Sequence, residues 1–151
     1  MKRRQFITIF GGAALAWSPA SRAQQPRKIP RIGYFSLGSA SAYASLVEAL
    51  RAGLKEAGYV DGTNVIIEFR WVDSTDDLPR FAAELVAMNV DVIFAPASPY
   101  VEPARQATLK IPIVFASHAD PVGLGHVASL SRPGGNITGV SMLLTELSVK
   151  D

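Results

Sequence analysis

The chain has 151 residues, 48% of them hydrophobic and 19% charged, a profile ordinary for one globular domain with a hydrophobic core. It contains no cysteine, which excludes disulfide bonds, thiolate metal sites and a cysteine nucleophile. The formal net charge is +2, but four of the 15 basic residues and none of the 13 acidic residues fall within residues 1–23. Residues 24–151 therefore carry 11 basic and 13 acidic residues, a balance of −2 that gives no support to nucleic-acid binding.

The first 23 residues have the three-part pattern of an export signal. Basic residues 2–4 are followed by a mildly apolar run over residues 6–17, and small residues lead up to Ala23. The apolar run, about 12 residues, is too short to cross about 30 Å of hydrocarbon. The stretch RRQFI, residues 3–7, resembles a twin-arginine signal, with the Sec route as the alternative. We expect cleavage after Ala23, export to the periplasm, and a leader over residues 24–30; a cytoplasmic tail or core helix is the other interpretation.

Strands and helices alternate along the rest of the chain. Short apolar runs predict five strands, over residues 31–35, 65–71, 90–95, 111–116 and 137–141. Apolar residues at helical spacing predict three helices, over residues 43–57, from Asp76 or Asp77 to Asn89, and from Ser98 to about Leu109. The third and fourth strands are almost wholly apolar, as in a parallel sheet covered on both faces. The fold class predicted for residues 31–141 is α/β, an open doubly wound parallel sheet of about five strands with flanking helices.

Local signals mark the ends of the predicted helices. Gly58 stands where a left-handed residue closes the first helix. We expect Asp76 or Asp77 to cap the second helix and Ser98 to cap the third.

Three predicted loops follow strands at their carboxyl ends, at residues 36–42, 96–99 and 117–122. Ligands bind beyond this edge of an open parallel sheet. The loops are rich in small residues, which let backbone N–H groups approach a ligand, and helix N-termini favour an anionic group. One such loop alone would be ordinary loop chemistry. Three in register favour a binding site.

Other chemistries find little support. No GxGxxG or Walker loop is present, so nucleotide binding is not indicated. The serines at 36, 39 and 41 do not lie in a GxSxG elbow. The acidic residues at 73, 76 and 77 lack the spacing of a calcium loop.

The segment SHADPVGLGH, residues 117–126, holds both histidines of the chain, with Asp120 between them. A metal site would need a third ligand, and a general base would need a nucleophile that nothing identifies, so we expect no bound metal. Asp120 and Pro121 more simply cap and begin a helical turn. A small flavodoxin-like enzyme that uses Ser117, His118 and Asp120 remains an alternative.

Longer motifs resemble a known family. They are DPVGLGHVASLSRPGGNITGVS at residues 120–141, ALRAGLKEAGYVDGTNV at residues 49–65, and the shorter EFRWVD and AAELV at residues 68–73 and 82–86. Together they resemble the periplasmic substrate-binding proteins of ABC transporters in the tryptophan/tyrosine-type group. His126 stands where that family commonly has leucine, which speaks against a required histidine there.

The resemblance implies a type-1 periplasmic binding fold, in which two α/β lobes close on a small molecule and the closed form docks on an ABC permease in the inner membrane. It implies an aromatic amino acid or similar ligand, no cofactor and no catalysis. The implied ligand-binding residues of this chain are Gly38, Ser39, Ser41, Ala97, Ser98, Ser117, His118, Asp120 and Pro121.

Family members have a second lobe, so we expect residues 142–151 to begin the crossover to it and the chain to be a truncated form. A single lobe offers half of a cleft, which predicts weak binding or none by this chain alone. A ligand-sensing lobe of a signalling protein is a further alternative.

Overall fold

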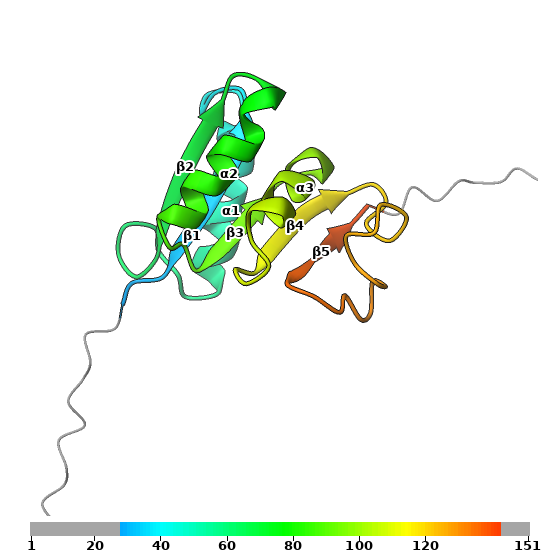
Figure 1. Ribbon diagram of the computed structural model, residues 1–151. Helices are drawn as coiled ribbons and strands as arrows, with labels where there is room; N and C mark the ends of the chain where they lie inside the picture. The colour runs from blue at the N-terminus through cyan, green and yellow to red at the C-terminus, as the bar shows by residue number, and fades with distance from the viewer. Residues whose placement is uncertain (1–27, 143–151) are drawn as a thin grey trace, which may run out of the picture.

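The computed structural model describes residues 28–142, which form one five-stranded sheet with helices on both faces (Figure 1). The strands are β1 (Arg31–Leu37), β2 (Ile66–Val72), β3 (Val92–Ala95), β4 (Ile113–His118) and β5 (Ile137–Ser141). The helices are α1 (Ala44–Glu56), α2 (Leu78–Ala87) and α3 (Ser98–Ala107), with one turn of 3-10 helix, η1 (Thr75–Asp77), before α2. The predicted export signal and nearly all of the predicted crossover lie outside the described residues.

All neighbouring strands of the sheet are parallel, in the order β2-β1-β3-β4-β5, which confirms the predicted fold class. The strand order reverses between β1 and β3. Because parallel crossovers are right-handed, this reversal places α1 on one face of the sheet and α2 and α3 on the other. Figure 1 shows α2 in front of β1 and β2, with α1 behind them. Within residues 28–142, no helix has the length and apolarity that a membrane crossing requires.

The two faces of the sheet are packed differently. On the α2 and α3 side, aliphatic and aromatic side chains such as Leu85, Ile93 and Phe115 are almost fully buried. On the α1 side the sheet is aromatic, and Tyr34 at its centre lies 5.8 Å from Phe94, ring centroid to ring centroid. The sheet therefore has its main hydrophobic core on the α2 and α3 face and an aromatic layer on the α1 face.

Two predicted helix ends are confirmed. Gly58 follows the C-cap of α1 with φ +87°, and the N–H of Tyr59 donates to the carbonyl of Leu54 at 2.8 Å. Asn89 follows α2 with φ +53°, a left-handed conformation that asparagine tolerates better than most residues.

One predicted N-cap position is confirmed and the other was wrong. Asp77 is the N-cap residue of α2, although it makes no side-chain cap bond, and Ser74 accepts the N–H of Asp76 at the start of η1. Ala97 is the N-cap of α3, so Ser98 lies one position inside the helix, where its side chain is free to reach another loop.

Two strands run further than predicted. β1 includes Ser36 and Leu37, and β4 includes Ser117 and His118, so two of the loops begin later than expected. Ser36 and His118 are each fully buried. Both residues are polar and carried no apolar signal. Their partners come from other elements, Tyr100 of α3 for Ser36 and His126 of the turn after β4 for His118.

We predict that Gly139→Ala lowers the free energy of unfolding by about 1–3 kcal/mol, the cost of overpacking a close contact. Gly139 has φ +156°, and a Cβ there would collide with the carbonyl oxygen of Phe115 on the neighbouring strand. Urea unfolding followed by circular dichroism measures the change. Gly53→Ala is the matched control: Gly53 lies in α1 with open space around it, so alanine should stabilise the chain by up to about 1 kcal/mol. A Gly139→Ala chain as stable as the native one would contradict the prediction.

Candidate ligand-binding site

The carboxyl ends of β1, β3 and β4 meet at one edge of the sheet, and all three predicted loops lie there. The edge includes the point between β1 and β3 where the strand order reverses. At such a reversal, the connections that follow the two neighbouring strands leave the sheet toward opposite faces, and open parallel sheets bind ligands between them. Strand order therefore assigns the candidate site to this edge.

The loop after β1 is held to β2 by its backbone. Gly38 has φ +97°, and its N–H donates to the carbonyl of Val72 at 2.9 Å. The hydroxyls of Ser39 and Ser41 are exposed and lie 2.9 Å apart, within hydrogen-bond distance of each other. These two serines are thus placed where hydroxyls could meet a ligand.

The start of α3 faces the same edge. The first N–H groups of a helix have no partner within the helix, and they favour an anionic group such as a carboxylate. Ala97, the N-cap, is extended and half-buried. The hydroxyl of Ser98 accepts the N–H of Ala119 at 3.1 Å, which ties the start of α3 to the loop after β4.

Tyr100 connects α3 to the end of β1. Its hydroxyl accepts the N–H of Leu37 at 3.3 Å and the hydroxyl proton of Ser36 at 3.2 Å, and its ring lies edge-on to Phe35. The sequence analysis missed this residue because one tyrosine on an apolar helix face carries no signal that distinguishes a strand anchor from ordinary core packing.

The two histidines form a chain of hydrogen bonds from the end of β4 to α3. His118 is fully buried, and its Nδ1 accepts the N–H of Asp120 at 3.1 Å. His118 Nε2 lies 2.7 Å from His126 Nδ1, and His126 Nε2 lies 3.1 Å from a carboxylate oxygen of Glu102 on α3. We call His118, His126 and Glu102 the histidine hydrogen-bond chain.

Burial and hydrogen bonding favour a neutral His118 near an ionised Glu102. Burial lowers the pKa of His118, and the neighbouring His126 lowers it further, while Asp120 acts in the opposite direction. Two hydrogen bonds from Arg105, both 2.7 Å, are the largest cause that lowers the pKa of Glu102 to about 2. At neutral pH, Glu102 is therefore ionised and accepts hydrogen bonds.

The predicted turn at Asp120 is confirmed, since its carboxylate accepts the N–H of Gly123 at 2.7 Å. Pro121 is buried behind this turn. His118 is buried as well, so the structure places these two predicted ligand contacts behind the wall of the site and not on its surface. Asp120 itself is exposed.

The arrangement does not form a catalytic triad. The two ring nitrogens of His118 are taken by the N–H of Asp120 and by His126, so neither is free for the hydroxyl of Ser117. The carboxylate of Asp120 holds its own turn rather than the imidazole. Within residues 28–142, no three ligating side chains converge where a metal ion could sit.

A cavity of about 480 Å³ lies on the α1 face and reaches the ends of β3 and β4. Its lining is mostly apolar and includes the predicted site residues Ala97 and Ser117. The other lining residues are Tyr34, Leu46, Ala49, Leu50, Phe94, Pro96 and Ala116. Its size falls within the usual range for small-molecule sites, and its aromatic floor would suit a flat apolar group.

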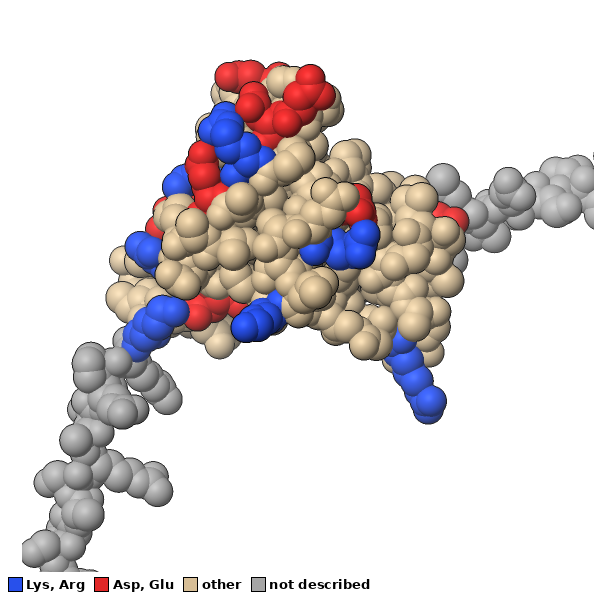
Figure 2. Space-filling model, viewed as in Figure 1, with Lys and Arg blue, Asp and Glu red and all other residues tan. Residues whose placement is uncertain are grey.

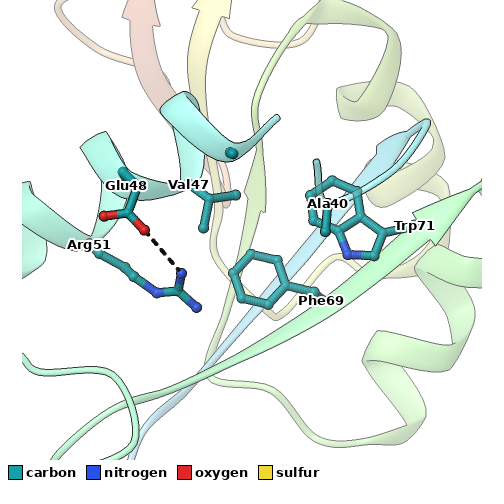
Figure 3. Close-up of a pocket in the computed structure, with 7 residues that line it drawn as sticks. Ala40, Val47, Glu48, Arg51, Phe69 and Trp71 are labelled. Carbon is teal, nitrogen blue, oxygen red and sulfur yellow. Dashed lines mark ion pairs between the residues drawn. The ribbon is translucent and has the colours of Figure 1, made fainter. Parts of the chain in front are cut away.

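A smaller hollow of about 180 Å³ lies between α1 and β2, where Phe69, Trp71 and Arg51 line it (Figure 3). The guanidinium of Arg51 is 5.5 Å from the Phe69 ring centroid and is paired with Glu48 at 3.8 Å and with Asp61 at 3.1 Å. Its charge is already matched and the hollow is small, so the carboxyl edge remains the candidate site. Figure 2 shows acidic side chains at the top of the molecule, over the connection from β2 to α2.

Comparison with known proteins decides the family. The family model described as ABC transporter substrate binding protein matches residues 36–150. The chain belongs to this family. The chain is also 38% identical, over 95 residues, to a tyrosine-binding protein of Clostridioides difficile strain R20291. That match covers 61% of the chain and 27% of the relative.

Solved structures of substrate-binding proteins share the fold. One is the ligand-free, open structure of a substrate binding protein with adhesive properties from Clostridium difficile, with TM-score 0.68 and 30% identity over 75% of this chain and 39% of that one. Another is an ABC domain from Streptococcus pneumonia in complex with L-Trp, with TM-score 0.67 and 31% identity over 74% of this chain and 38% of that one. The chain thus spans less than half the length of these relatives.

We predict that Ser98→Ala speeds amide hydrogen exchange at Ala119, because the hydroxyl of Ser98 is the acceptor of that N–H. Loss of one such bond costs about 0.5–1.5 kcal/mol, so exchange should rise by about two- to tenfold. Ser41→Ala is the control, because the exposed hydroxyl of Ser41 bonds only to the hydroxyl of Ser39 among the described residues. Equal exchange rates at Ala119 in the native and Ser98→Ala chains would show that the tie between the loops does not exist.

Proposed function

We propose that the chain forms the first lobe of an exported solute-binding protein, which captures a small molecule at the carboxyl edge of its sheet. The observation that carries this proposal is the reversal of strand order between β1 and β3, the place where open parallel sheets bind ligands, in a chain of the ABC transporter substrate binding family. No bond chemistry is proposed, because His118 and Asp120 are engaged in hydrogen bonds that hold the loop after β4.

The proposed ligand is an aromatic amino acid or a similar small molecule. Two relatives support this class, one named a tyrosine-binding protein and one solved with L-Trp. The start of α3 would receive a carboxylate, and the exposed Ser39 and Ser41 would offer hydroxyls. The cavity beside Tyr34 and Phe94 would receive an aromatic ring at its outer end.

In the same proposal, residues 1–23 direct export to the periplasm and are removed after Ala23, and residues 142–151 lead toward a second lobe. Closure of the two lobes would cover the ligand, and the closed form would then dock on an ABC permease in the inner membrane. The described lobe spans 39% of the open solved relative, so it supplies one wall of that cleft.

We predict that this chain binds aromatic amino acids weakly, since one wall encloses only part of a ligand. L-Tyr and L-Trp at millimolar concentration should shift the amide resonances of residues 38–43, 96–98 and 119–121 in NMR spectra. L-Lys at the same concentration should shift them less. Calorimetry that gave micromolar affinity would contradict the half-cleft argument.

A pair of variants locates the binding. Ala97→Glu puts a carboxylate at the N-cap of α3, where it would repel the carboxylate of the ligand, so the shifts should disappear. Leu109→Glu is the matched control, because Leu109 is 79% exposed beyond the opposite end of α3. Shifts centred on Phe69 and Trp71, or none with any amino acid, would refute the proposed site.

A further inference from the structure

The hydrogen-bond chain through the two histidines accepts only a fixed number of protons. The N–H of Asp120 is always a donor, so Nδ1 of His118, which it faces at 3.1 Å, must carry no proton. A neutral His118 therefore has its proton on Nε2 and donates it to Nδ1 of His126 across 2.7 Å. The proton of His126 is then on Nε2, where it is donated to Glu102 across 3.1 Å.

A third proton has no place in this arrangement. On Nδ1 of His118 it would face the N–H of Asp120, and on Nδ1 of His126 it would face the N–H of His118. Either position brings two donors together at hydrogen-bond distance, in a region where the side chain of His126 is only 6% exposed. One of the hydrogen bonds must therefore break when the pair gains a proton.

These bonds hold the parts of the proposed ligand wall together. Glu102 lies on α3, whose first turn faces the site, and His126 closes the turn that begins at Asp120. The carbonyl of His118 also accepts the N–H of Met142 and the hydroxyl of Ser141, which fixes the end of β5. The chain of three side chains thus joins the end of β4, the turn after it and α3.

We propose that His118, His126 and Glu102 are positioning residues, which set the loop at residues 119–124 against α3 and release it when the histidine pair gains a proton. The inference rests on the proposed function only for its link to ligand binding. The titratable and charged groups around His118 are His126, Asp120, Glu102 and Arg105, and β5 contributes only a hydroxyl and backbone groups.

The tautomers provide the first test. Nitrogen NMR of the native chain at about pH 7.5 should show the proton of each histidine ring on Nε2 and none on Nδ1. A His126 ring protonated on both nitrogens in the folded chain at that pH would overturn the inference. This measurement requires no substitution, so it tests the inference even if a variant fails to fold.

The second test follows stability and loop protection with pH. The folded pKa of His118 lies below its ordinary value near 6.5, so its contribution to stability is complete above about pH 6.5 and is lost as the pH falls. Amide protection at Gly123 and Leu124 should therefore fall between about pH 7.5 and pH 5.

The matched control is His118→Val together with His126→Leu, which removes both titrating rings and leaves an apolar pair. Its protection factors should change less than about twofold over the same interval, since no titrating ring remains in the chain of bonds. An equal loss in the native and doubly substituted chains would overturn the inference.

Titration with L-Tyr at both pH values then tests the link to the ligand. Weaker binding at low pH is expected in the native chain and not in the double variant. Absence of binding at every pH would refute the proposed function alone, because the tautomer and protection measurements use no ligand. Binding that is independent of pH while protection changes would overturn the positioning role.

Discussion

The candidate site depends on the first turns of α3, because these turns hold the ends of two strands at once. Ser98 accepts the N–H of the loop after β4, Tyr100 holds the end of β1, and Glu102 reaches the end of β4 through two histidines. These three residues alternate along the helix, and each bonds to a segment far away in the sequence. The relative position of these strand ends therefore depends on where one helix lies and not on three independent loops.

Much of the fold follows from local patterns. All five strands and all three main helices lie where apolar periodicity predicts them, because a strand or helix must bury one continuous face. The errors lie at element ends. Ser36 and His118 extend their strands since α3 and its neighbours satisfy their polar atoms, and Ala97 is the N-cap of α3 where Ser98 was expected. Local sequence cannot show a partner supplied by another element.

The site was predictable in position and not in detail. Strand order alone places Gly38, Ala97 and Asp120 at one edge, since the carboxyl ends of parallel strands coincide. The anchors behind that edge join residues 63 positions apart for Tyr100 and 24 positions apart for Glu102 and His126. Such pairs have no spacing signal, so a single sequence gave no reason to set Tyr100 and Glu102 apart from other helix residues.

The buried histidine pair shows what a polar contact contributes that an apolar one does not. A leucine at position 126 would fill a similar volume through contacts without direction. His126 instead needs a donor on one side and an acceptor on the other, and both are present at 2.7 and 3.1 Å. Directional bonds fix the angle between the turn and α3 more narrowly than apolar packing, at the cost of a penalty for any unpaired polar atom. The hydrogen bonds that hold the turn against α3 require one proton on each histidine ring. An additional proton would therefore break one of them.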